Sequence, residues 1–178
     1  MRTMIKRLRA EGEGDEGFTL IELLVVLLII GILLAIAIPT YLSVTGGAKK
    51  SAAQSNLNTA LTAAKSIYVN NNGNYPTNTT LLTDFQAAGT SLQYTAAGPT
   101  AATNMISFNE TDSGSTVVLA ASDGTNCYFV DDVEGTGSTA IGVTSGGTWW
   151  STQKSTTCNS TAAPTSGSSW SNSPSTSG

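Results

Sequence analysis

A single carboxylate, Glu22, lies near the start of an otherwise apolar stretch that runs from Phe18 to Ile38. An ionisable side chain within such a stretch is costly to bury in a membrane, so by default it has a function and a partner. A partner is close by, because a cut between Gly17 and Phe18 would create an amino terminus four residues before Glu22. This amine could belong to the same subunit or to a neighbour in an assembly. The sequence therefore predicts an acid–amine pair that forms after proteolysis.

Groups for other kinds of chemistry are scarce in this chain. Histidine is absent, and charged residues make up only 11% of the sequence. Without histidine there can be no Ser–His or Cys–His pair, and the side chain most used for acid–base work and metal ligation is missing. We therefore expect no enzymatic activity and no cofactor.

A group of acids between residues 123 and 134 could bind a cation. Hard cations such as calcium take oxygen ligands, which Asp123, Asp131 and Asp132 would supply. The spacing is not that of an EF-hand loop, and acids in solvated turns are the commoner explanation of such a group. A calcium site and ordinary turn acids thus both remain open.

The apolar stretch is long enough to cross a bilayer. As a helix, residues 18–38 span roughly 30 Å at about 1.5 Å per residue. The many Leu, Ile, Val and Phe side chains together contribute about −5 to −10 kcal/mol to insertion, whereas one central acid costs about 3 kcal/mol. Insertion is favoured despite Glu22.

Residues 1–17 form a hydrophilic leader rather than an ordinary secretory signal. Its basic residues are expected to keep this end in the cytoplasm, so the rest of the chain faces outward; they are Arg2, Lys6, Arg7 and Arg9. Removing the leader leaves four lysines and eight acids, a net charge of 4 − 8 = −4. Because nucleic-acid affinity depends mainly on Lys and Arg contacts to phosphate, we expect no strong nucleic-acid binding by this subunit alone.

The order of these features resembles a known family. The run Gly17-Phe18-Thr19-Leu20-Ile21-Glu22, followed by an unbroken apolar helix and Pro39, is similar to the N-terminus of type IV pilins and pseudopilins. The resemblance covers about a third of the chain and implies that a prepilin peptidase cuts after Gly17 and methylates Phe18. It also implies that Glu22 pairs with a neighbouring subunit's N-terminal amine. Gly31 and Pro39 match the family's pattern, at a stretch of the helix that can loosen on assembly. Relative to alanine, glycine destabilises a helix by about 1 kcal/mol and proline by about 3 kcal/mol, so this stretch is expected to be the weakest part of the helix.

Beyond Pro39, apolar residues recur at helical spacing, as in Leu57, Leu61, Ala64 and Tyr68, so residues 39–72 are predicted to be an amphipathic half of the same helix. The pair Gly46-Gly47 is expected to bend or locally melt it. The turn formers of residues 70–76 end it. Residues 73–103 are predicted to be a connecting loop with a short helix near 81–88.

From residue 104 apolar residues recur at every second position, which is the spacing of β-strands. Strands are predicted at about 104–109, 115–122, 126–131, 139–144 and 148–152. Hairpin signals between them indicate an antiparallel meander. We expect its apolar face to pack on the helix through Val118, Phe129, Ile141 and Trp149. The predicted fold is α+β: a long N-terminal helix, with a transmembrane and an amphipathic half, on a small antiparallel sheet with one core, as in type IV pilins.

Two cysteines lie in the outward part of the chain. In an oxidising compartment such a pair is more often a disulfide than two thiols, so Cys127 and Cys158 are predicted to be bridged. The sheet and this bridge make a disulfide-bounded region at 104–158, which resembles that of pilins. Residues 159–178 are low-complexity and uncharged, and are predicted to be a flexible tail.

Three functional hypotheses follow. The first is a major-type pilin that waits in the cytoplasmic membrane with its head outside and then polymerises with itself, through the inner-membrane assembly machinery, into a surface pilus. The second is a pseudopilin of a type II secretion or competence system. The third is a single-span membrane protein with an outward binding domain, which leaves Glu22 unexplained. Twitching motility, cell adhesion, DNA uptake and secretion are separate tasks that depend on motor and minor subunits.

Overall fold

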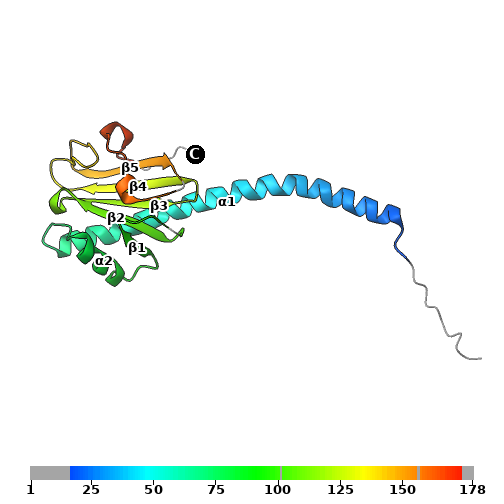
Figure 1. Ribbon diagram of the computed structural model, residues 1–178, viewed down its shortest axis with the longest axis horizontal. Coiled ribbons are helices and arrows are strands. Elements are labelled where there is room, and N and C mark those ends of the chain that lie inside the picture. The colour runs from blue at the N-terminus through cyan, green and yellow to red at the C-terminus, as the bar shows by residue number, and fades with distance from the viewer. Residues whose placement is uncertain (1–16, 101, 156, 174–178) are drawn as a thin grey trace, which may run out of the picture. The chain divides into compact units, whose positions relative to one another are not determined.

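The computed structural model describes residues 17–100, 102–155 and 157–173. The predicted leader, apart from Gly17, and the last five residues of the predicted tail lie outside this part of the chain. The chain divides after Ser43 into two compact units, which we describe separately. Figure 1 shows the helices and strands.

Helix α1, Leu20–Asn70, is continuous over 51 residues. It passes through Gly46 and Gly47 without interruption, so the predicted local melting at this pair is wrong. The helix ends where the sequence indicated: Asn72 and Gly73 adopt left-handed conformations, with φ of 59° and 78°. The amide of Gly73 then donates to the carbonyl of Tyr68 at 3.0 Å, which satisfies one of the helix's last carbonyls.

Five strands form one sheet in the order in which they occur in the sequence (Figure 1). The strands are β1 Gln93–Ala96, β2 Met105–Thr111, β3 Thr116–Ser122, β4 Asn126–Val133 and β5 Gly147–Lys154. Strand β1 pairs with β2 in parallel, and the other neighbours are antiparallel. The predicted α+β fold is confirmed, and four of its strands match β2 to β5.

Two details of the predicted element order are wrong. Residues 73–103 contain the predicted short helix, which is α2, Asn78–Ala87, but they also contain strand β1, which was not predicted. The predicted strand at 139–144 is absent from the described structure, where only an isolated bridge joins Ser138 to Val143. Gly137 and Gly142 break the strand: both have positive φ, and a Cβ at either would lie within 2.6 Å of a backbone oxygen.

The first core lies between the sheet and the two helices. Alanines of α1 allow the helix to approach the sheet closely, and Leu57 and Ile67 fill the space between them. Helix α2 contributes Phe85, whose ring stacks on Tyr94 of β1 with centroids 4.4 Å apart and tilts against Phe108 of β2 at 5.1 Å. The residues of the sheet that face this core include Ile106, Phe108, Val117, Leu119 and Val130.

The opposite face of the sheet carries a second core, so the predicted single core is wrong. The side chains expected to face the helix all lie here instead: Val118, Phe129, Ile141 and Trp149. Strand β3 is buried on both faces, with Val117 and Val118 each at most 2% exposed. An apolar run without alternation cannot indicate which face meets the helix, which explains the error.

The C-terminal segment covers part of this second core, so the predicted flexible tail is wrong for residues 159–173. Trp170 is 6% exposed, and its ring lies edge-on to Phe129 with centroids 6.5 Å apart. Its indole N–H donates to the carbonyl of Pro164 at 2.9 Å. Ser171 exchanges two backbone hydrogen bonds with Trp150 of β5. One tryptophan therefore anchors a segment whose composition alone suggests disorder.

Replacing Trp170 by alanine is expected to lower the free energy of unfolding by about 3–5 kcal/mol, because it removes a large buried side chain from the second core. The measurement is urea unfolding of the full chain in detergent, followed by far-UV circular dichroism. Ser173→Ala, an exposed change three residues further on, is the control and should change stability by less than about 0.5 kcal/mol. Equal stability of the two variants would contradict the packing described here.

Candidate functional site

The first part of α1 is an apolar surface exposed along its whole length. Every residue from Gly17 to Val44 is exposed. Among the described residues, α1 alone is long and apolar enough to cross a membrane, with a mean hydropathy of 3.2 over its most apolar window. Leaving this much apolar surface in water is unfavourable, so the segment requires lipid or other apolar helices around it.

Glu22 caps the start of this helix. Its Oε2 accepts hydrogen bonds from the backbone N–H of Thr19 at 2.9 Å and from the Thr19 hydroxyl at 2.8 Å. In return, the Glu22 N–H donates to the Thr19 hydroxyl at 3.3 Å. This reciprocal arrangement is a capping box, which satisfies two of the backbone N–H groups that a helix start leaves unpaired.

The capping role of Glu22 was not among the predictions, although its signal is in the sequence. Thr19 and Glu22 have the Thr-x-x-Glu spacing of a capping box, directly before an apolar run. Both bonds from Thr19 end on Oε2, so the cap leaves Oε1 able to accept from a second donor. The predicted acid–amine pair is therefore compatible with the cap.

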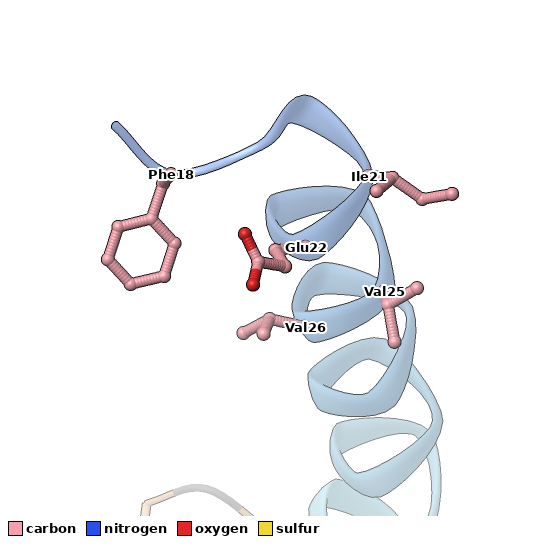
Figure 2. A pocket seen from close by; sticks show the side chains of 5 residues that line it. All are labelled: Phe18, Ile21, Glu22, Val25 and Val26. Atoms are coloured by element: carbon pink, nitrogen blue, oxygen red, sulfur yellow. The ribbon is translucent and has the colours of Figure 1, made fainter. Parts of the chain in front are cut away.

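Phe18 and Glu22 line a shallow apolar pocket on the helix surface together with Ile21, Val25 and Val26 (Figure 2). In this view the Phe18 ring, the Glu22 carboxylate and Val26 lie on one side of the helix. The site thus presents a carboxylate beside apolar side chains. This surface can receive an apolar helix that brings a positive charge.

Gly31 and Pro39 both lie within α1, which continues past them. Among the described residues, no atom other than the neighbouring backbone of the helix itself lies within 4 Å of where a Cβ at Gly31 would be. Packing inside the subunit therefore does not require a glycine there. After Pro39, which has no N–H to donate, the Thr40 hydroxyl donates to the carbonyl of Ile36 at 2.9 Å.

The three acids of the predicted calcium site are not brought together. Asp123 lies in the β3–β4 turn, where its carboxylate accepts from the Thr125 and Asn126 amides at 2.8 and 2.7 Å and from the Tyr128 hydroxyl at 2.7 Å. Partial burial raises the pKa of Asp123, but these hydrogen bonds outweigh it and lower the pKa below its ordinary value. Asp131 and Asp132 lie toward the other end of β4, where alternation puts them on opposite faces.

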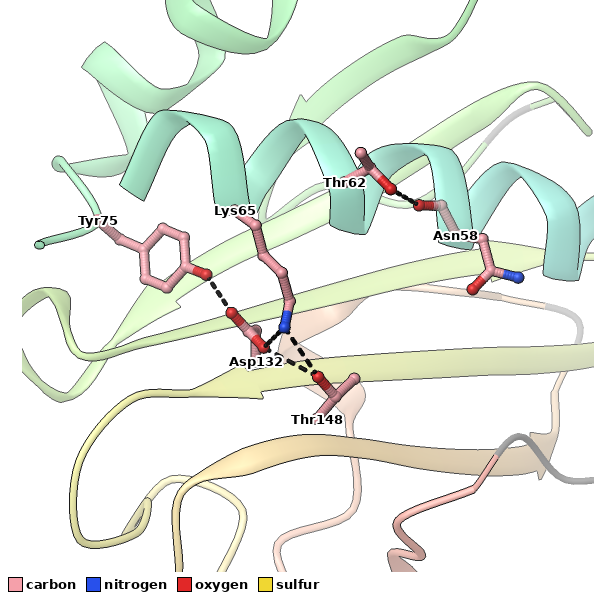
Figure 3. A network of polar contacts seen from close by, with 6 residues as sticks. All are labelled: Asn58, Thr62, Lys65, Tyr75, Asp132 and Thr148. Carbon is pink, nitrogen blue, oxygen red and sulfur yellow. Dashed lines mark hydrogen bonds and ion pairs between the residues drawn. The ribbon is translucent and has the colours of Figure 1, made fainter. Parts of the chain in front are cut away.

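Asp132 holds α1 to the sheet (Figure 3). Its carboxylate lies 3.0 Å from the Lys65 ammonium and accepts from the hydroxyls of Tyr75 and Thr148 at 2.6 and 3.1 Å. Burial raises the pKa of Tyr75, and the hydrogen bond to Asp132 raises it further. Asp132 is 2% exposed but fully partnered, so it acts as a structural anchor and not as a free cation ligand.

Asp131 lies on the other face and is fully buried. Neither of its carboxylate oxygens has a hydrogen-bond partner among the described residues. Burial raises the pKa of Asp131 well above its ordinary value, and the charges of Asp132 and Asp112 raise it further.

The predicted disulfide joins Cys127 of β4 to Cys158, with 5.2 Å between their Cα atoms. It fixes the start of the C-terminal segment against the second core, to which both cysteines belong. A loop of this length gives roughly 3–4 kcal/mol in the chain-entropy account of disulfide stabilisation. The bridge therefore restrains the segment that Trp170 anchors further along.

Comparisons with known proteins address the N-terminal segment. Residues 14–38 match the family described as "Prokaryotic N-terminal methylation motif". The chain is 50% identical over 54 residues to the type IV major pilin protein PilA of Myxococcus xanthus, a match that covers 30% of this chain and 24% of PilA. It is 48% identical over 54 residues to a fimbrial protein of Pseudomonas aeruginosa, covering 30% of this chain and 35% of that protein.

The matched part of this chain therefore spans about a quarter to a third of the length of these curated relatives. No solved structure matches the chain. The methylation motif includes the junction between Gly17 and Phe18, the capped Glu22 and most of the exposed apolar helix. The N-terminal segment of this chain is therefore similar to that of type IV pilins.

Proposed function

We propose that this chain is the structural subunit of a type IV pilus, a major-type pilin that polymerises with itself into an extracellular helical filament. The observation that carries the proposal is the exposed apolar helix with a single acid, Glu22, at its start. The names of the relatives support it, since one is a major pilin and another a fimbrial protein.

Proteolysis prepares the subunit in this proposal. A prepilin peptidase removes residues 1–17 on the cytoplasmic face and methylates the new amine of Phe18. Until assembly, the apolar helix lies in the cytoplasmic membrane and the head lies outside. The inner-membrane assembly machinery then transfers the helix from lipid to the filament core, where other apolar helices surround it in place of acyl chains.

Glu22 sets the register of this transfer. Its Oε2 is used by the Thr19 cap, and its Oε1 accepts from the Phe18 amine of a neighbouring subunit. An unpaired charge in the apolar core is costly, so a subunit that enters out of register is disfavoured. Gly31 and Pro39 mark the part of the helix that loosens when subunits pack.

A pseudopilin of a secretion or competence system would use the same N-terminal chemistry. We favour the pilin because the relatives are named as a pilin and a fimbrial protein and because a disulfide bounds the C-terminal region. The two functions differ in where the processed chain accumulates.

Mass spectrometry of filaments sheared from the native cell surface tests the proposal directly. We expect abundant peptide that begins at N-methylated Phe18 in the sheared fraction. The remaining cell membranes serve as the control for lysis. Methylated Phe18 found only in membranes would favour the pseudopilin, and an intact Met1 would contradict processing and with it both functions.

Replacing Glu22 by alanine is expected to leave membrane insertion intact and to lower the filament yield by at least about tenfold. Insertion survives because the apolar residues supply about −5 to −10 kcal/mol, whereas loss of one member of a buried charge pair costs on the order of 3–5 kcal/mol. Insertion is measured by membrane fractionation and yield by immunoblotting of sheared filaments.

Thr19→Ala is the matched control, because it removes the capping hydroxyl and keeps the acid. It should cost about 1 kcal/mol of helix stability and leave most of the filament yield. If the Thr19 and Glu22 variants assemble equally poorly, Glu22 acts through the cap and the register role is wrong.

A further inference from the structure

Asp131 is a buried acid that the proposed assembly does not use. It lies on the face of β4 that carries the second core, opposite Val118 of β3 and Trp149 of β5. Its side chain is fully buried, and neither carboxylate oxygen has a hydrogen-bond partner among the described residues. A charged carboxylate without a partner is very costly to bury. This acid is therefore compatible with the closed fold only while it carries a proton.

The polar groups on the same face do not stabilise a charge at Asp131. Thr116 lies two residues before Val118 on β3, and Thr111 of β2 lies directly opposite Thr116, so alternation puts both threonines on the face of Asp131. Neither hydroxyl has a hydrogen-bond partner among the described residues, so neither donates to the carboxylate. An ionised Asp131 would lack the donors that surround Asp123 in its turn.

The lysines of the described residues do not face Asp131. Three of them belong to α1, which packs on the other face of the sheet; they are Lys49, Lys50 and Lys65. Lys154 alternates with Trp149 along β5 and so also points to the helix side. It pairs in register with Asn126, at the far end of β4 from Asp131. A counter-charge for an ionised Asp131 is thus missing from the described chain.

The titratable groups around Asp131 are all acids. Asp112 follows β2, Asp132 lies on the helix side of β4, and Glu134 begins the loop after β4. Strand β3 and the C-terminal residues 157–173 contain no charged residue. Burial raises the pKa of Asp131 well above its ordinary value, and the charges of Asp132 and Asp112 raise it further. Its surroundings therefore favour the protonated acid.

The loop after β4, residues 134–146, covers the end of the second face near Asp131. Ile141 and Val143 of this loop belong to the second core. Within these residues the structure has no helix or strand, and the Ser138 hydroxyl ties the loop to Asp112 at 2.6 Å. A segment held by few contacts can open without unfolding the rest of the domain. The loop is therefore the part of the second unit that can give way most easily when Asp131 loses its proton.

We propose that the loop after β4 is a pH-sensitive lid over Asp131. The lid is closed while the acid carries its proton and opens when the acid ionises, because opening lets water reach the carboxylate. The proton passes from the carboxyl O–H to water or buffer, and no covalent bond of the backbone changes. The lid is distinct from Glu22, and its operation does not depend on the proposed assembly function.

Hydrogen exchange of the loop's backbone amides reports the opening. In the open lid Asp131 titrates near its ordinary pKa of 3.8, whereas burial raises its pKa in the closed lid. The closed lid thus binds more protons above about pH 4, so its stability is lost as the pH rises toward the raised pKa. We expect the protection factor, which is the slowing of exchange relative to a free peptide, to fall up to about tenfold per pH unit.

The measurement is hydrogen exchange with mass spectrometry on peptides that cover residues 134–146. The full chain is used in detergent, in buffer free of divalent cations, between about pH 4 and pH 8. Asp131→Asn removes the titrating group and should give protection factors that do not change with pH. Asp84→Asn removes an acid on α2 and is the matched control, so it should keep the wild-type slope.

Two results would overturn the proposal. A wild-type protection factor that is independent of pH would do so even if Asp131→Asn folds poorly. A slope that persists unchanged in Asp131→Asn would show that another group titrates.

The amides of α1 separate a lid from unfolding of the whole second unit. Residues 57–67 lie in the first core, so they exchange only through more extensive unfolding. We expect their protection factors at about pH 7 to exceed those of the loop by at least about tenfold. Equal protection of helix and loop at every pH would show that Asp131 acts on the whole fold, and the lid would be wrong.

Discussion

The structure depends on an apolar helix surface that has to be kept out of water. Residues 18–38 expose almost nothing but Leu, Ile, Val and Phe, with one acid at the start. Either a bilayer or a set of similar helices can cover such a surface, since both are apolar. In the proposed function, the helix moves from the bilayer into a set of similar helices. Glu22 is the group most affected by this transfer, because its charge finds a partner only among the helices.

In the second unit of the chain, which begins at Val44, both faces of a small sheet are buried. Helices α1 and α2 cover one face, and the loop after β4 and the C-terminal segment cover the other. On the helix side, the ion pair between Lys65 and Asp132 fixes the helix to the sheet, and on the other side the disulfide fixes the C-terminal segment covalently. The loop after β4 and the C-terminal segment have little regular structure, so their position depends on specific contacts such as those of the Trp170 ring with Phe129 and Pro164.

The N-terminal half of the molecule could be predicted because its signals are local. An apolar run, a proteolytic junction and one acid within a few residues specify the helix and its chemistry, and the Thr19 spacing would also have specified the cap. The sheet was harder, because its arrangement depends on distant residues. Strand β3 is apolar on both sides, so its pattern could not assign Val117 and Val118 to opposite cores.

The C-terminal segment has a consequence for how subunits behave when they are crowded together. Strand β5 is the last strand of the sheet, and an open last strand is a template for pairing with another molecule. Ser171 occupies that position at Trp150 through two backbone hydrogen bonds, while the opposite edge, β1, is only four residues long. Ser171 thus covers part of the β5 edge and leaves less of it open to pairing with another molecule.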